Sequence, residues 1–274
     1  MIPRDYITAW RATVPWVDDS QVEQDLIISR TLVEIFSEKE LASNLAFRGG
    51  TALHKLHFRS AARYSEDVDL VQIRAGAIGP VLTALHKKLD PWLGAPQRSQ
   101  SEGRVTLNYR FLSEDAPPLR LRLKVEINSR EHFTVFGYKT VSFKVDSRWF
   151  RGSARIVTYE LEELLATKLR ALYQRRKGRD LFDLALALEK TKVDPKRIVQ
   201  AFGEYMDHEG HKVTRALFER SLAAKLRNPQ FIADIGPLLA SSYEFDRDKA
   251  AELVLHRLVA LVPGEPWKKP RAEK

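Results

Sequence analysis

Apolar residues recur with two different periods along the chain. From residue 18 to residue 36 they recur every three or four positions, which is typical of a helix with one buried face. In several short runs between residues 67 and 145 they recur every second position, which is typical of strands. From Tyr159 onward the helical period returns. The pattern predicts an α+β part followed by a helical part.

The same pattern predicts individual elements. Ser20 and Glu23 have the spacing of a capping box at the start of the first helix. The polar segment 99–103 predicts a mobile loop, and segment 113–118 predicts a long hairpin connection. We expect helices at 18–36, 51–58 and 80–89, and strands at 45–47, 67–73, 105–111, 119–128 and 138–145.

The change of period near residues 150–158 predicts a domain boundary. We expect a first domain over 1–155, a helical domain over 156–265, and a flexible polar tail over 266–274. The chain has 274 residues, enough for two domains that each bury a core. Its apolar content of 44% and charged content of 30% are typical of a globular protein.

Charge and cysteine content narrow the classes of function. The net charge of +9 favours an acidic partner, most often nucleic acid, although a soluble protein can also simply be basic. The absence of cysteine excludes disulfides, thiolate metal sites and cysteine nucleophiles. No secretory signal and no apolar run of membrane-spanning length is visible, so we expect a soluble, cytoplasmic protein.

Gly49-Gly50-Thr51 lies where the expected strand 45–47 runs into a helix. Glycines let a backbone turn sharply and approach a ligand closely, and a helix start presents free N–H groups to an anion. The Thr51 hydroxyl can add a further contact. The triplet therefore predicts a phosphate-binding turn, although alone it is also compatible with a purely structural turn.

Asp67 and Asp69 stand two apart in the expected strand 67–73, so their carboxylates point to the same face. Two such acids repel each other unless a cation lies between them, and oxygen ligands suit Mg²⁺ or Mn²⁺. The alternative is a pair of exposed acids on an edge strand. We favour the metal pair, because Val68 and Leu70 give this strand an apolar core face.

Glu126 is the candidate for a third carboxylate from a neighbouring strand. It shares a face with Arg122, Lys124 and Asn128, so a solvated polar face with cross-strand ion pairs is an equally good interpretation.

The segment 160–188 is the second informative region. Lys168 lies in an otherwise apolar helical pattern, where its side chain either extends to the surface or reaches a triphosphate. Six positive side chains and no acid lie from Lys168 to Arg179, and Asp180 and Asp183 follow at helical i, i+3 spacing. The two acids can serve helix capping and salt bridges; the whole cluster favours substrate contact.

Four segments together resemble a known family. Gly49 to Leu53, Tyr64 to Asp69, Glu162 to Lys168 and Arg179 to Leu184 resemble, in order, the motifs of the AbiEii/AbiGii nucleotidyltransferase toxins. These toxins include the mycobacterial MenT group and belong to the DNA polymerase β-like nucleotidyltransferase superfamily.

The resemblance implies a mixed sheet flanked by helices, followed by a helical C-terminal domain that completes the active site. It implies that Asp67 and Asp69 hold Mg²⁺ and the triphosphate, and that Lys168 binds the triphosphate or the leaving pyrophosphate. Asp180 or Asp183 would be needed for activity. The residues implied to contact phosphates are Gly49, Gly50, Thr51 and Ser65.

The resemblance further implies a toxin paired with an antitoxin, and transfer of NMP from an NTP to the 3′ end of tRNA. Two alternatives stay open. One is transfer of NMP to Ser, Thr or Tyr of a protein, and the other is a non-catalytic RNA-binding module.

Overall fold

The computed structural model describes residues 2–58, 60–115 and 117–268. The chain forms two compact units. The first comprises Met1–Glu160 with Ala240–Tyr243, and the second comprises Leu161–Leu239 and Glu244–Lys274. The division after Glu160 differs from the expected one after residue 155, because an additional strand continues to Tyr159. Of the tail expected over 266–274, residues 269–274 lie outside the described residues.

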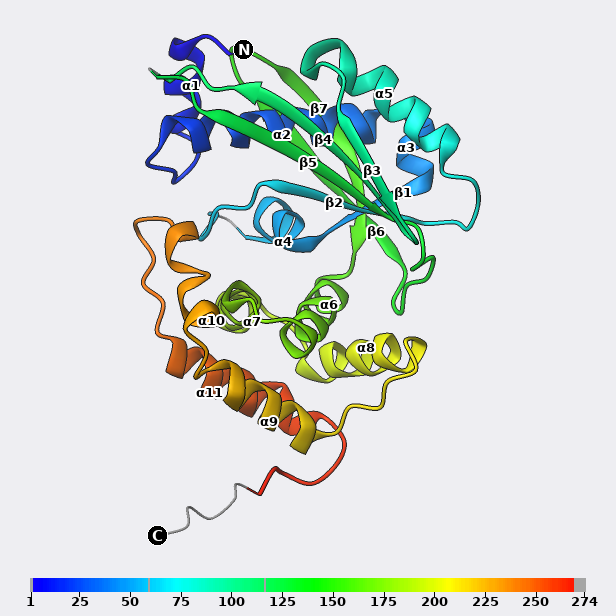
Figure 1. Ribbon diagram of the computed structural model, residues 1–274, viewed down its shortest axis with the longest axis vertical. Helices are drawn as coiled ribbons and strands as arrows, with labels where there is room; N and C mark the ends of the chain where they lie inside the picture. The colour runs from blue at the N-terminus through cyan, green and yellow to red at the C-terminus, as the bar shows by residue number, and fades with distance from the viewer. Residues whose placement is uncertain (1, 59, 116, 269–274) are drawn as a thin grey trace. The chain divides into compact units, whose positions relative to one another are not determined.

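The first unit is built on a seven-stranded mixed sheet with the order β3-β4-β5-β2-β1-β7-β6 (Figure 1). Strand β2 pairs in parallel with β5, and β1 pairs in parallel with β7. The other neighbouring strands are antiparallel. The strands are β1 (Leu45–Arg48), β2 (Asp67–Gln72), β3 (Gln97–Ser101), β4 (Arg104–Leu112), β5 (Arg120–Asn128), β6 (Tyr138–Asp146) and β7 (Arg151–Tyr159).

Helices cover one face of this sheet. The long helix α2 contacts β5, β6 and β7, and α5 contacts β4 (Figure 1). The inward residues of β4 and β5, such as Leu107 and Val125, are completely buried, because period-two alternation directs every second side chain to the helices. The helical elements of this unit are α1 (Arg4–Arg11), α2 (Asp19–Ser37), α3 (Lys39–Asn44), α4 (Gly49–Ala52), the π-helix η1 (Leu53–His57) and α5 (Gly79–Leu93).

The expected strands at 45–47, 67–73, 105–111, 119–128 and 138–145 are confirmed, and each begins within one residue of its predicted position. The loop expected at 99–103 is wrong, because β3 extends to Ser101 and pairs with β4. All five β3 residues are exposed at the sheet edge, so the strand carries no apolar alternation.

The predicted capping box at the start of α2 is wrong, and the helix expected at 51–58 is confirmed with a different start. Helix α2 begins at Asp19, so Ser20 lies inside it, and Glu23 instead accepts a 3.0 Å hydrogen bond from the Glu114 N–H. The helix expected at 51–58 begins at Gly49 and changes into a π-helical turn at Leu53.

The second unit is helical, which confirms the predicted change of pattern. The side chains of Asp194, Thr214, Asn228 and Asp246 cap four of its helices by accepting backbone N–H groups. Its helices are α6 (Leu161–Gln174), α7 (Gly178–Lys190), α8 (Pro195–His208), α9 (Arg215–Lys225), α10 (Pro229–Ala233) and α11 (Arg247–Arg257), with 3₁₀ turns η2 (Gly236–Leu238) and η3 (Val259–Leu261). Across the described part of the chain, every helix is too short or too polar to cross a bilayer.

Candidate active site

The glycine turn in the first unit joins β1 to α4. Gly49 has φ +82°, in the left-handed region that favours glycine. A Cβ atom at Gly49 would lie 2.2 Å from Asp69 Oδ2, and one at Gly50 would lie 2.3 Å from an Arg63 guanidinium nitrogen. Glycine is therefore required at position 49, where the backbone passes directly against a carboxylate, whereas a side chain at position 50 would have to displace the Arg63 guanidinium group.

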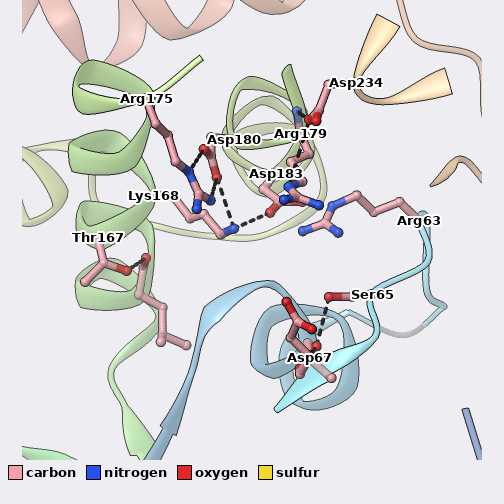
Figure 2. Close-up of polar contacts among 12 residues, drawn as sticks. Arg63, Ser65, Asp67, Thr167, Lys168, Arg175, Arg179, Asp180, Asp183 and Asp234 are labelled. Carbon is pink, nitrogen blue, oxygen red and sulfur yellow. Dashed lines mark hydrogen bonds and ion pairs between the residues drawn. The ribbon is translucent and has the colours of Figure 1, made fainter. Parts of the chain in front are cut away.

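Thr51 and Ser65 connect this turn to strand β2. The buried Thr51 hydroxyl donates to the backbone carbonyl of Asp67 at 2.5 Å, and its oxygen lies 2.8 Å from Ser65 Oγ. Because the Thr51 hydrogen is already donated, the Ser65 hydroxyl donates to Thr51. Figure 2 shows Ser65 directed toward the segment that carries Asp67. The two hydroxyls hold the turn and the acid strand together.

Asp67 and Asp69 lie on one face of β2, as the alternation predicts, while Val68 and Leu70 point into the core. Burial is the main cause that raises the pKa of each carboxyl group above its usual range. At Asp69 the nearby Asp67 carboxylate raises the pKa further. The surroundings therefore disfavour two ionised carboxylates at this place.

One oxygen of this pair also lacks a partner. Asp67 Oδ1 is buried and accepts no hydrogen bond from the described residues. Two crowded carboxylates and an unsatisfied buried oxygen fit the expected Mg²⁺ or Mn²⁺, which Asp67 and Asp69 would hold. Over residues 2–58, 60–115 and 117–268, no set of three or more acidic or histidine side chains is arranged to hold a metal ion.

Glu126 lies opposite Asp69 in the β2–β5 register, beside the acid pair. Its carboxylate is 2.8 Å from Lys124 Nζ and 3.3 Å from Arg104 Nε. Lys124 itself is also 3.7 Å from Asp67. The cross-strand ion pairs that were the alternative interpretation are therefore present. A metal role for Glu126 stays a prediction.

The candidate residues of the second unit form their own cluster between α6 and α7 (Figure 2). Lys168 Nζ lies 3.2 Å from Asp180 Oδ1 and 2.9 Å from Asp183 Oδ2, and both aspartates are completely buried. Arg175 binds Asp180 through two hydrogen bonds of 2.7 and 2.8 Å. Burial raises the pKa of Asp180, but Lys168 and Arg175 outweigh it and hold that pKa below its usual value.

The basic turn before α7 is partly neutralised by one acid. Asp234 accepts a 3.2 Å hydrogen bond from the Arg179 N–H, and its carboxylate is 3.2 Å from Lys177 Nζ. Asp180 does not cap α7, because the N-cap residue is Lys177 and Asp180 is paired as described. Lys168, Asp180 and Asp183 are thus brought together in one unit, and Gly49, Gly50, Thr51, Ser65, Asp67, Asp69 and Glu126 in the other.

Comparison with known proteins assigns these motifs to a family. Residues 30–256 match the family model described as nucleotidyl transferase AbiEii toxin, Type IV TA system. The chain belongs to this AbiEii family. It is accordingly a nucleotidyltransferase toxin of a type IV toxin–antitoxin system. No curated protein matches the chain.

Solved structures support the AbiEii fold. MenT4, a nucleotidyltransferase toxin from Mycobacterium tuberculosis H37Rv, matches with a TM-score of 0.67 at 18% identity, over 95% of this chain and 90% of that one. JHP933 from Helicobacter pylori matches with a TM-score of 0.55 at 14% identity, over 90% of this chain and 93% of that one. These similarities confirm the predicted mixed sheet flanked by helices and the helical C-terminal part.

Sequence reasoning missed several residues around these AbiEii motifs. Arg63 is buried, packs over Gly50 and donates to the Tyr64 carbonyl at 3.0 Å, but its position between a glycine turn and an acid strand carries no periodic signal. Asp234 lies more than fifty positions beyond the turn that it neutralises. Alternation placed Lys124 on the face of Glu126, but its contact with Asp67 depends on the pairing of β5 with β2, which alternation does not reveal.

Proposed function

We propose that this AbiEii protein transfers NMP from an NTP to the 3′-terminal hydroxyl of tRNA, with Mg²⁺ or Mn²⁺ held by Asp67 and Asp69. A cognate antitoxin is the partner that the family implies.

One observation carries the proposal: the glycine turn and the acid pair are built against each other. The Gly49 backbone approaches Asp69 so closely that a methyl group at Gly49 would overlap the carboxylate. A phosphate group on the turn would therefore lie beside the acids, where bound cation and phosphate can share charge. The buried guanidinium of Arg63 over Gly50 adds a positive charge to the same place.

The reaction follows from this placement. The 3′-hydroxyl oxygen attacks the α-phosphorus of the NTP, the bond to the oxygen bridging the α- and β-phosphorus breaks, and pyrophosphate leaves. The hydroxyl proton passes to water. The divalent cation would supply electrostatic stabilisation of the charge that develops on the phosphate oxygens. Gly49 and Gly50 would orient the triphosphate by N–H contacts, and Ser65 would add a hydroxyl contact by turning its hydrogen from Thr51 to a phosphate oxygen.

Lys168 would bind the triphosphate or the leaving pyrophosphate, as the resemblance implies. Its ammonium group is held between Asp180 and Asp183, which fixes its position in the second unit. The aspartates therefore act in the proposal as positioning residues for Lys168.

The test is incubation of the protein with total tRNA, Mg²⁺ and each α-³²P-labelled NTP in turn. We expect label in RNA with at least one NTP, and none when EDTA removes the metal. Asp67→Asn, which keeps the side-chain shape, is expected to lower kcat at least about 100-fold. Asp146→Asn, at an exposed acid of β6, is the matched control and keeps the activity.

Three outcomes would contradict the proposal in different ways. Label that survives RNase and migrates with protein would indicate nucleotidylation of a protein side chain. RNA binding without pyrophosphate release would indicate a non-catalytic module. Transfer that persists in Asp67→Asn and in EDTA would remove the metal role of the acid pair.

A further inference from the structure

Strands β4 and β5 present a polar face on the side opposite their buried residues. In the register of these strands Thr106 lies opposite Glu126 and Asn108 opposite Lys124. The charged residues of this face are five cations and one acid. They are Arg104, Arg110, Arg120, Arg122, Lys124 and Glu126.

This face is hollowed. A groove of about 460 Å³ runs over β3, β4 and β5. Its lining includes Ser99, Thr106, Asn108, Arg104, Arg122 and Lys124. None of the lining residues is aromatic. Hydroxyl, amide and guanidinium groups are the usual contacts of phosphate and sugar, whereas the aromatic rings on which bases most often stack are absent from this lining.

The groove leads to the acid pair. Lys124 of the groove lies opposite Asp67 in the parallel pairing of β5 with β2, and Glu126 lies opposite Asp69. Neighbouring strands are about 4.8 Å apart, so β4 and β2 are separated by roughly 10 Å. A chain that lies in the groove can therefore place its end at Asp67 and Asp69.

The positive charges at the outer part of this face are only weakly neutralised by nearby acids. The Arg122 guanidinium is 3.9 Å from Glu66, and both side chains are about half exposed. Arg110 donates to the neutral side chain of Gln97 at 2.8 Å. Exposed ion pairs of this kind are weak, so the face has an excess of positive charge.

We propose that this groove binds the sugar–phosphate backbone of an RNA acceptor strand and directs its 3′ end to Asp67 and Asp69. The inference rests on the proposed function for the identity of the reaction, and it adds where the acceptor lies and how it is recognised. Recognition is through phosphates, without reading of the base sequence.

The test measures binding and transfer separately. Binding of a 5′-fluorescein-labelled tRNA is followed by anisotropy at several KCl concentrations, without NTP. The two groove variants are Arg122→Ser, in the lining of the groove, and Arg110→Ser, beside the lining and opposite Arg122 in the β4–β5 register. Each is expected to raise the Kd at least about fivefold. Each should also lower the slope of log Kd against log salt by about 0.7 to 0.9, because one phosphate contact is lost.

Arg155→Ser is the matched control. Arg155 is an exposed arginine of β7 that donates across strands to Thr140 at 2.9 Å, much as Arg110 donates to Gln97. The Arg155→Ser substitution removes one positive charge, as the groove substitutions do, but at a different place in the sheet. We expect it to leave Kd and salt slope within twofold of the wild-type values. The KM for NTP should be unchanged in all three variants.

The outcomes separate the two proposals. Weaker tRNA binding in Arg110→Ser and Arg122→Ser, with unchanged binding in Arg155→Ser, supports RNA binding in the groove. This conclusion holds even if no label is transferred, because a lack of transfer would refute only the proposed reaction. Equal losses in all three variants, or no loss in the groove variants, overturn the groove. Label transferred to RNA with an unchanged KM for tRNA in the groove variants also overturns it and leaves the reaction standing.

Discussion

At the scale of single residues, two glycines with nearly the same positive φ differ in what surrounds them. Gly49 has φ +82° and Gly137 has φ +85°. Apart from Gly137 itself and its two chain neighbours, no heavy atom of the described residues lies within 4 Å of a Cβ built on Gly137, whereas the one built on Gly49 overlaps Asp69. Substitution of these two glycines can therefore separate two costs of adding a side chain: the strain of a positive φ, and the displacement of a carboxylate.

We therefore expect different results from Gly49→Ala and Gly137→Ala. Both variants carry about 1–2 kcal/mol of backbone strain, because alanine is disfavoured at positive φ. Only Gly49→Ala must also move Asp69, so it should lose more stability and lose nucleotide transfer. Urea unfolding and the labelled-NTP assay measure the two effects. Equal stability and equal activity in both variants would show that the close approach at Gly49 has no consequence.

Residue-scale prediction from the sequence succeeds where one period decides the geometry. Asp67 and Asp69 share a face because any strand places i and i+2 together. The surroundings of Glu126 were undecided, because its partners depend on which strands are neighbours and in which register. Alternation along one strand contains neither piece of information.

At the scale of elements, the ion pairs of Lys168 and Arg175 with Asp180 tie α6 and its following turn to α7. Asp180 is completely buried and accepts from both cations. The pKa of Asp180 is lowered in the folded protein, since the two cations outweigh the effect of burial. Removal of this carboxylate takes away an ion-pair partner that Lys168 and Arg175 share. The packing of α6 against α7 should therefore weaken.

Asp180→Asn is expected to lower the free energy of unfolding by about 3–5 kcal/mol at pH 7, the usual cost of breaking a buried pair. Because the folded pKa is depressed, the carboxylate stabilises the fold fully above its unfolded pKa near 4 and loses this contribution as pH falls through the folded pKa. Urea unfolding from pH 7 to pH 3 measures both proteins. The difference in the free energy of unfolding between the wild-type protein and Asp180→Asn should be constant down to about pH 5 and shrink below pH 4. A difference that grows on acidification would contradict the ion-pair explanation.

Elements were predictable where one face is buried. Strands β4 and β5 alternate apolar and polar residues along their length, and their positions were confirmed. Strand β3 at the sheet edge has no buried residue, and β7 buries only residues near its C-terminal end. Neither strand therefore has the complete alternation by which strands are recognised.

At the scale of the whole molecule, the chain does not pass from one unit to the other only once. Residues Ala240–Tyr243 belong to the first unit, although the segments on either side belong to the second. The Ala240 N–H donates to the Ala62 carbonyl at 3.0 Å, and both alanines are buried. Such a return carries no periodic signal, because four residues are too few to show a period. The sequence could therefore indicate that the chain has two parts, but not that residues 240–243 belong to the first one.

The return of the chain has a measurable consequence for the stability of one amide. If Ala240 belongs to the first unit, its N–H should exchange with solvent only when that unit opens. Leu123→Ala in β5 and Leu169→Ala in α6 each remove a completely buried leucine and should each cost about 2–5 kcal/mol, in different units. Native-state hydrogen exchange followed by NMR should show the Ala240 amide lose protection in Leu123→Ala together with the amides of β2. In Leu169→Ala it should keep its protection while the amides of α7 lose theirs. The reverse response would place residues 240–243 with the helical unit, and equal losses in both variants would show that the two units open as one.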